Sequence, residues 1–451
     1  MKLYKRFLSL VENKSTKNGI YATIDVAISP VFMIIATPIF IHYLGIESYG
    51  LWVLINSVIS SLAIFNFGIN DIIIKFISKA ALQNDNNEIK NIFSSIFVFQ
   101  CLVALSILLI SFFSLSILTN FEFILLYREI LYIAIPIFFI KQFEQSIYAF
   151  FKSYEQYNYV ALFSVFSKSF FFISQIAAAI IYQSVYYVFL FALIIGFLVF
   201  LIEIIFIKKI HLSAVFFFNA KFTTLRKLYS YGIWNWLASL ISIVTVHLDK
   251  WLITAILGLE IFGYYSIGIL IFNQIYNVLS SSVSWIFPKI AKNNLNLKDS
   301  KRFFYNLSYY IISITLLISL FFNGFQNIFI LWLGEESFNN SRFYIESFLI
   351  ILPVFTLSTV SHYYILAVGK VKEKFIIDSI TFLLKVFSLY YFLYLLNFEY
   401  WPYSFLIFLT FQALAYYIVI DKCFKMYNIK KYSLIITLLL IIIFIRLIIN
   451  L

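Results

Sequence analysis

The residues most able to do chemistry in this chain are a few charged side chains inside long apolar segments. The clearest case is TVHLDKWLITAIL, residues 245–257, where Asp249 and Lys250 stand side by side. If such a segment crosses a bilayer, a charge near its centre costs about 2.5–3.5 kcal/mol on insertion scales. Each of these charges is therefore expected to face a partner group or a water-filled cavity.

Adjacent positions on a helix point about 100° apart, so Asp249 and Lys250 cannot pair well with each other. We expect them to face different neighbours. Asp249, and also Asp25 in the first apolar segment, could interact with a cation or could fix helices by ion pairing. The sequence leaves both roles open.

Lys168 and Lys385 each lie about ten residues into an apolar segment, near mid-bilayer at 1.5 Å per residue. Neither has an acidic residue three or four positions away. Each must reach a wet cavity, a carboxylate on another helix or an anionic ligand, or else lose its proton.

Several other charges have simpler explanations. Lys141 and Glu144 are three residues apart on one helix face and could neutralise each other. Glu203 is expected close enough to a membrane interface to be solvated, and Asp378 is expected at an interface beside Lys374.

The composition indicates that these segments do cross a membrane. The chain has 451 residues, of which 63% are hydrophobic and only 12% are charged, whereas soluble domains carry about a quarter charged residues. The expected fold class is an all-α polytopic membrane protein. The two cysteines, Cys101 and Cys423, do not suggest a disulfide framework.

Apolar runs of about 20 residues are long enough to span a bilayer as helices. Twelve such runs position the charges, and the expected spans are 20–43, 50–76, 91–118, 128–151, 159–182, 185–207, 228–256, 262–288, 303–332, 343–368, 375–396 and 402–420. A thirteenth apolar run at 433–449 is a possible further helix.

The basic residues indicate an orientation. With a cytoplasmic amino terminus, 26 of the 33 lysine and arginine residues fall on the cytoplasmic side, as the positive-inside rule requires. This distribution accounts for the net charge of +12 and removes the argument for nucleic-acid binding. The expected location is a bacterial cytoplasmic (inner) membrane, with multiple passes.

Two halves of the chain repeat each other. The segment LGIESYGLW at 44–52 corresponds to LGLEIFGYY at 257–265, and Lys168 corresponds to Lys385 at a similar offset. Glycine suits a tight turn between two helices because it accepts positive φ. The expected domains are six-helix lobes at 1–210 and 211–421, followed by an apolar segment at 422–451.

The pattern PIFIHYLGIESYGLWVLINSVISSLAIFNFGI, with LDKWLITAILGLEIFGYYSI in the second half, resembles the Wzx-type polysaccharide flippases of the MOP exporter superfamily. The resemblance covers the chain to about residue 421 and implies two MATE-like lobes related by a pseudo-two-fold repeat. The run at 433–449 departs from the plain twelve-span pattern.

The resemblance further implies that an undecaprenyl-diphosphate-linked oligosaccharide moves from the inner to the outer leaflet by alternating access. Besides this cargo and membrane lipids, polysaccharide polymerase and glycosyltransferases are the expected partners. A diphosphate needs cations in the cavity. The lysines expected to bind the substrate are Lys168, Lys385, Lys250 and Lys141. The acidic residues expected to couple transport or to form ion pairs are Asp249, Asp25 and Glu144.

Two alternative functions would require different residues or loops. A cation-coupled multidrug antiporter of the same superfamily would favour acidic cavity residues over lysines. A membrane enzyme such as a polymerase would need a large outer loop, which the spacing of the spans does not allow. The sequence contains no phosphate-binding glycine loop, metal-ligand spacing or catalytic triad, so we expect neither an enzyme nor a cofactor.

Overall fold

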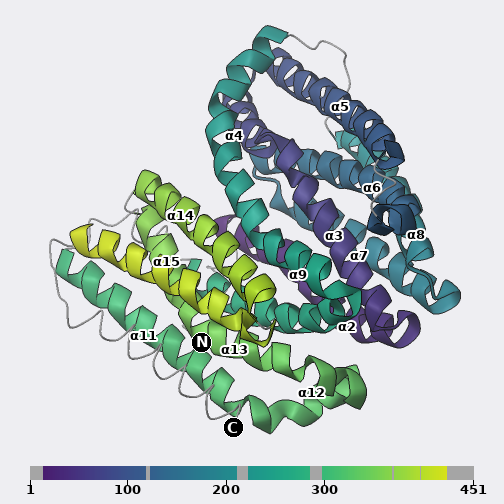
Figure 1. Ribbon diagram of the computed structural model, residues 1–451. Coiled ribbons are helices and arrows are strands. Elements are labelled where there is room, and N and C mark those ends of the chain that lie inside the picture. The colour runs from purple at the N-terminus through teal and green to yellow at the C-terminus, as the bar shows by residue number, and fades with distance from the viewer. Residues whose placement is uncertain are drawn as a thin grey trace, which may run out of the picture. The chain divides into compact units, whose positions relative to one another are not determined.

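The computed structural model describes residues 14–117, 122–210, 222–284, 297–367, 370–396 and 398–423. All of its described elements are helical. Contacts between residues divide the chain into two compact units, unit 1 at 1–243 and unit 2 at 244–451. Figure 1 shows the helices of each. The expected thirteenth run at 433–449 lies outside the described residues.

Unit 1 is a bundle of long helices. Its described elements are α2 (Lys14–Leu44), α3 (Ile46–Ser61), the 3₁₀ turn η1 (Leu62–Asn66), α4 (Ile69–Leu82), α5 (Asn86–Ile117), α6 (Glu122–Ser153), α7 (Tyr157–Tyr182), α8 (Val185–Ile210) and the first part of α9 (Phe222–Ser284). Helix α7 packs against both α2 and α8, and α6 packs against α8 and α4. The four helices α2, α6, α7 and α8 are therefore joined side by side.

The second expected span, 50–76, is broken rather than continuous. Phe67 and Gly68 both have positive φ, at 50° and 72°, and they separate η1 from α4. Backbone carbonyls freed by such a break must find donors inside the membrane. The indole nitrogen of Trp236 in α9 donates to the carbonyl of Ile64 at 2.5 Å, and Gln142 in α6 donates to that of Phe65 at 3.3 Å.

The contact of Trp236 also explains where the division between the units falls. The expected lobe boundary, between 210 and 211, lies beside the undescribed residues 211–221. The first part of α9 packs into unit 1, because Trp236 bonds to η1 and lies 5.1 Å from the Phe67 ring. The division consequently lies inside α9, between Ile243 and Val244.

Unit 2 is organised around one long helix. Its described elements are the rest of α9, α11 (Leu297–Phe321), the 3₁₀ turn η3 (Phe322–Phe325), α12 (Gln326–Leu333), α13 (Glu335–Ala367), α14 (Val371–Tyr390), the π-turn η4 (Tyr391–Leu395), the 3₁₀ turn η5 (Phe398–Tyr400) and α15 (Trp401–Cys423). Helix α13 packs against α11, α12, α14 and α15, and α14 also packs against α15. At Gly268 of α9, an added Cβ would lie 2.9 Å from the backbone of Tyr344 in α13, so these helices approach closely there.

The repeated glycine turns have the expected geometry. Gly45 joins α2 to α3 with φ 83° and ψ 165°, and Gly258 bends α9 with φ 85° and ψ 176°. A third turn, not expected from the sequence, uses Leu333 and Gly334 between α12 and α13, with φ 83° and ψ 154°. All three place a leucine before the glycine and a helix directly after it.

Eleven helical segments among the described residues are long and apolar enough to cross a membrane. One of them, Ser239–Ser280, has 42 residues and contains the bend at Gly258. It holds the described parts of two expected spans, 228–256 and 262–288. The eleven segments therefore correspond to the twelve expected crossings.

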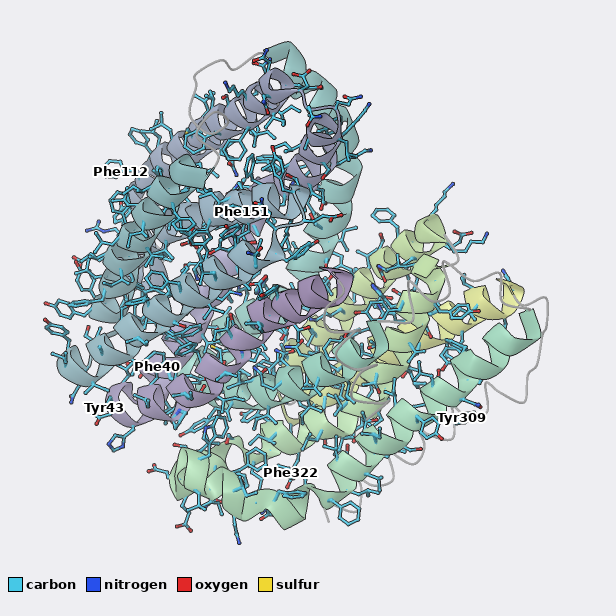
Figure 2. All side chains as sticks on the ribbon, turned by 180° about the vertical axis from the view of Figure 1, so that it is seen from behind. Phe40, Tyr43, Phe112, Phe151, Tyr309 and Phe322 are labelled. Carbon is cyan, nitrogen blue, oxygen red and sulfur yellow. The ribbon has the colours of Figure 1, made fainter. Side chains whose placement is uncertain are left out.

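Apolar side chains cover the outside of each unit as well as its core, as expected for a protein surrounded by lipid. Phe40 and Phe151 are fully buried, whereas Phe112 and Tyr309 are 58% and 42% exposed. These residues are labelled in Figure 2, where Phe112 and Tyr309 lie on the outside of the ribbon.

The glycine turns give a direct test of the fold. Gly45→Ala places a Cβ in open space but at φ 83°, so strain alone should lower the free energy of unfolding, by about 1–2 kcal/mol. Gly324→Ala also enters open space but lacks the positive φ, and it is the matched control. Thermal unfolding in detergent should show a lower melting temperature for the first variant only. Equal melting temperatures for the two variants would contradict this account of the turn.

Candidate functional site

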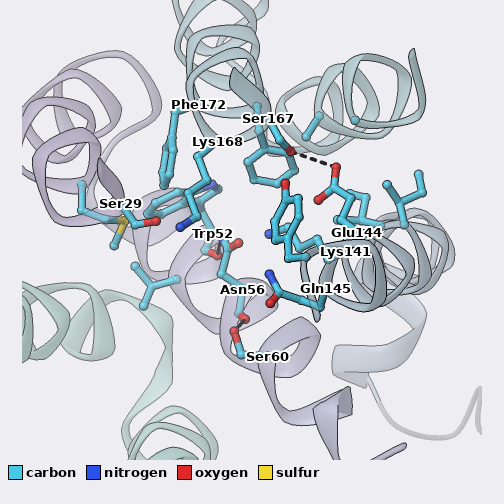
Figure 3. A pocket seen from close by; sticks show the side chains of 18 residues that line it. Ser29, Trp52, Asn56, Ser60, Lys141, Glu144, Gln145, Ser167, Lys168 and Phe172 are labelled. Carbon is cyan, nitrogen blue, oxygen red and sulfur yellow. Dashed lines mark hydrogen bonds between the residues drawn. The ribbon is translucent and has the colours of Figure 1, made fainter. Parts of the chain in front are cut away.

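Unit 1 contains a cavity of about 340 Å³ whose lining is mainly apolar but includes several polar and charged side chains. It lies between α2, α3, α6, α7 and α8. Eighteen residues line it: Ser29, Met33, Trp52, Val53, Asn56, Ser60, Ile137, Ile140, Lys141, Glu144, Gln145, Tyr148, Ser167, Lys168, Phe171, Phe172, Ala192 and Gly196. Figure 3 shows the side chains of Lys141, Lys168 and Asn56 directed toward the centre of this space. Three of the expected site residues, Lys141, Glu144 and Lys168, thus come together in one cavity.

The helix period explains how α6 supplies its wall. Glu144, Gln145 and Tyr148 lie three, four and seven residues after Lys141, and residues at these spacings share one helix face. Of these four, Lys141 and Glu144 were expected from the sequence as site residues, whereas Gln145 and Tyr148 were not. The same spacing would have found both.

Helix α3 contributes an aromatic and an amide. Trp52 is 2% exposed, and its indole nitrogen donates a 2.9 Å hydrogen bond to Gln175 of α7, which fixes the ring at the cavity wall. Asn56, one turn further on, donates to the Trp52 carbonyl at 2.9 Å. Asn56 was not expected, because a single amide in an apolar run carries no distinguishing pattern.

Lys168 has a carboxylate partner on another helix. Its ammonium nitrogen lies 2.8 Å from Oδ1 of Asp25 in α2, and it also donates to the Asp25 carbonyl oxygen at 2.6 Å. Ser164, one turn before Lys168, donates to the same Oδ1. The side chains of Lys168 and Asp25 remain 27% and 17% exposed, so this ion pair is open to the cavity side.

The expected pair of Lys141 and Glu144 does not form. No carboxylate oxygen of the described residues lies within 4.0 Å of the Lys141 ammonium nitrogen, which stands 4.0 Å from the centre of the Phe171 ring. Glu144 instead accepts a 2.8 Å hydrogen bond from Ser167 in α7. The correct spacing on α6 was not sufficient, because ring and hydroxyl partners on α7 hold the two side chains apart. Lys141 is therefore a cavity cation without a carboxylate partner in the described part of the chain.

Asp249 faces a lysine on another helix of unit 2. Its Oδ1 lies 2.8 Å from the ammonium nitrogen of Lys385 in α14, and its Oδ2 accepts a 2.7 Å bond from the Tyr265 hydroxyl. Lys385 also donates to the Thr245 carbonyl at 2.6 Å. Asp249 pairs with Lys385 rather than with the adjacent Lys250, as expected from the helix geometry.

Lys385 was expected to line a substrate cavity, and the structure places it in an enclosed ion pair within unit 2. Its side chain is 6% exposed and that of Asp249 is 1% exposed. The rings of Phe405 and Phe408 lie 5.2 and 5.7 Å from the Lys385 ammonium nitrogen. Of the surroundings expected for Lys385, the structure shows a carboxylate on another helix. A lysine enclosed in this way cannot release its aspartate without exposing two charges to an apolar core.

The two halves of the chain carry corresponding lysines, but the carboxylates that pair with them do not correspond. Lys168 and Lys385 each hold a backbone carbonyl and a carboxylate on the first helix of their own unit. At the 213-residue offset of the glycine turns, however, Asp25 corresponds to Ala238 and Asp249 to Ala36. The two ion pairs therefore lie at different distances from their glycine turns.

The remaining expected residue, Lys250, is partly buried in α9. No carboxylate of the described residues lies within 4.0 Å of it. Asp378 does pair with Lys374, at 2.5 Å, as the sequence predicted. Glu203 was expected to be solvated, but it is fully buried, because α8 extends its apolar contacts past this position to Ile207.

No group of three or more His, Cys, Asp or Glu side chains suited to a metal ion occurs among the described residues. The cavity thus offers two ammonium groups, one carboxylate, amides, hydroxyls and aromatic rings. This set of groups can bind a polar, anionic molecule, but it contains no arrangement for bond cleavage.

Solved structures support the fold class. The chain matches an inward-facing multidrug resistance MATE family transporter of the MOP superfamily with a TM-score of 0.67 and 14% identity, over 90% of this chain and 98% of that one. An outward-facing transporter of the same description matches with a TM-score of 0.61 and 13% identity, over 92% and 97%. A third match, with a TM-score of 0.61, 15% identity and the same coverage, is a MOP superfamily transporter from Pyrococcus furiosus, which is described as having a binding pocket of reverse polarity. The expected MATE-like all-α fold is confirmed.

The sequence comparisons place the chain in a family. A search of curated proteins found no significant match. A family model described as "Polysaccharide biosynthesis protein" matches residues 15–294, which is 280 of the 451 residues. The solved structures that share this fold are described as transporters. Because the match covers more than half of its length, the chain belongs to the polysaccharide biosynthesis protein family.

Proposed function

We propose that the protein is a flippase that moves an undecaprenyl-diphosphate-linked oligosaccharide from the inner to the outer leaflet of a bacterial cytoplasmic membrane. The two repeated halves would alternate access to the cargo, and the polyprenyl chain would stay in lipid. Family membership supports a role in polysaccharide biosynthesis. The nature of the cargo comes from the resemblance to Wzx-type flippases, and the ammonium groups of the cavity are compatible with it.

The observation that carries this proposal is the environment of Lys141. A lysine inside an apolar bundle needs an anion, and the described residues place no carboxylate within 4.0 Å of this one. A diphosphate entering the cavity would supply the missing negative charge. The ammonium group would in turn replace part of the water that the diphosphate loses.

Lys168 supports the same cargo in a different way. It is already paired with Asp25, but the pair is partly exposed. A phosphate oxygen could therefore share the ammonium group without first opening a sealed core. In this proposal Lys141 and Lys168 bind the diphosphate, while Asp25 holds Lys168 in place between cargo molecules.

The rest of the cavity suits sugar rings. Trp52, Tyr148 and Phe172 provide flat apolar faces, and Asn56 and Gln145 provide amide donors and acceptors. Sugars combine apolar ring faces with hydroxyl edges, so they need both kinds of surface. Lys250 remains a candidate cargo residue, and Asp249 acts with Lys385 as a structural pair.

The orientation and partners follow from the cargo and the positive-inside count. A cytoplasmic amino terminus puts the basic loops on the side where glycosyltransferases would complete the lipid-linked oligosaccharide. A polysaccharide polymerase would use the product on the other side. Both enzymes are therefore proposed as neighbours in the same biosynthetic route.

One observation favours a second candidate, a cation-coupled multidrug antiporter. Glu144 lines the same cavity, and no cationic group of the described residues lies within 4.0 Å of its carboxylate. A cationic drug could bind there. Two ammonium groups in the cavity oppose this reading, because they would repel such a drug.

Translocation of a fluorescent lipid-linked oligosaccharide in proteoliposomes tests the proposal. Lys141→Gln and Lys168→Gln should each lower the rate about tenfold or more, because each removes a charge-assisted contact with the diphosphate. Lys372→Gln, at an exposed position outside the cavity, is the matched control and should transport normally.

Efflux of a cationic dye from the same vesicles separates the two candidates. Dye efflux that requires Glu144, together with oligosaccharide movement unaffected by both lysine variants, would reject the flippase and favour the antiporter.

The different burial of the two ion pairs gives a stability prediction. Lys385→Met should lower the free energy of unfolding by about 3–5 kcal/mol, because it strands a buried carboxylate. Lys168→Met should lower it by less, because the Asp25 side chain is 17% exposed and its charge is less enclosed. Unfolding in detergent measures both values. The double variant Asp249→Asn with Lys385→Met should regain part of the loss, and no recovery would argue against the pairing.

A further inference from the structure

Glu203 of α8 is a carboxyl group sealed inside unit 1. Its exposed fraction is 0%, and its neighbours Ile204 and Ile207 belong to an apolar cluster that includes Ile147 and Phe163. Its Oε1 accepts a 3.0 Å hydrogen bond from the Tyr148 hydroxyl. Its Oε2 has no hydrogen-bond partner in the described part of the chain.

Such a carboxyl group is stable only when it carries a proton. An ionised carboxylate with one neutral donor and no cation would be left largely unsolvated, at a cost of several kcal/mol. No lysine or arginine of the described residues lies within 4.0 Å of Glu203. The protonated form removes the charge and leaves a short polar group in an apolar site.

The titratable groups around Glu203 come from the helices packed against α8. From α6, Tyr148 bonds to it and Glu144 interacts with it electrostatically, with Lys141 one turn further along the same face. From α7, Tyr159 packs on the same apolar cluster, and Lys168 lines the adjoining cavity with its partner Asp25 of α2. The cavity-facing residues of α3 are uncharged.

Tyr148 connects this sealed group to the cavity. Tyr148 lines the cavity and donates to Glu203, while Glu144, four residues earlier on α6, lines the same cavity. A hydroxyl in this position can pass a proton in either direction. It gives its own hydrogen to Glu203 and takes another from cavity water or from a protonated Glu144, so Tyr148 remains neutral and one proton moves.

We propose that Glu203 is a proton-binding site that exchanges with the cavity of unit 1 through the Tyr148 hydroxyl and is linked to anion binding there. An anion at Lys141 and Lys168 is repelled less by a neutral Glu203 than by an ionised one. Anion and proton therefore bind cooperatively, and by linkage each strengthens the other. The identity of the cargo rests on the proposed function, whereas the proton site does not.

Infrared spectroscopy of the purified full-length protein tests the proton directly. The wild type should show a carbonyl-stretch band of a protonated carboxyl group that disappears as the pH is raised, and Glu203→Gln should lose that band. Tyr148→Phe should keep the band, shift its frequency and slow its exchange with deuterium. Asp421→Asn is the matched control, since Asp421 is a buried carboxyl that accepts a 2.8 Å bond from Tyr305 in unit 2. No difference between Glu203→Gln and the wild type would overturn the proposal.

Binding of inorganic diphosphate tests the linkage. At low pH the wild type and Glu203→Gln should bind equally, because glutamine imitates the protonated acid. As the pH rises, the wild type should weaken relative to Glu203→Gln by about fivefold or more. Comparing the variants at each pH cancels the ionisation of diphosphate itself.

The two proposals can fail separately. A Glu203 band with a normal pH response but no movement of lipid-linked oligosaccharide would reject the flippase and keep the proton site. Oligosaccharide movement with parallel pH profiles in the wild type and Glu203→Gln would reject the linkage and keep the flippase.

Discussion

The cost of placing charge in an apolar bundle governs this structure. Lys385 and Asp249 meet that constraint by enclosing each other, with Tyr265 and a backbone carbonyl completing their hydrogen bonds. Lys168 and Asp25 meet it in part, because their pair stays open to a cavity. Lys141 meets it through an aromatic ring, without a carboxylate close to it in the described part of the chain. The three lysines thus range from a fully enclosed ion pair to an ammonium group that contacts an aromatic ring.

The sequence was sufficient for the scaffold. Run length predicted the crossings, and the LG turns at Gly45 and Gly258 predicted two tight bends with positive φ. It also predicted that Asp249 and Lys250 diverge. Local sequence rules are sufficient for these features because a membrane helix forms the hydrogen bonds of its own backbone. Segment length and hydropathy then decide where the helix lies.

The partners of the charges could not be read in the same way. Asp25 and Lys168 are 143 residues apart, and no local spacing marks them as a pair. Lys141 and Glu144 had the spacing of a pair but were held apart by Phe171 and Ser167 of another helix. Glu203 was assigned to an interface because distance along the chain does not show which neighbours cover a residue. In each case the missing information was how one helix packs on the next.

The three glycine turns show that the smallest repeating piece of this chain is a helical hairpin rather than a half. Gly334 repeats the leucine, the backbone angles and the following helix of Gly45, although it lies at a different place within its unit. A hairpin closed by so short a turn has no polar loop to carry across by itself. Its two helices are therefore suited to enter the bilayer together during synthesis, as a single insertion step.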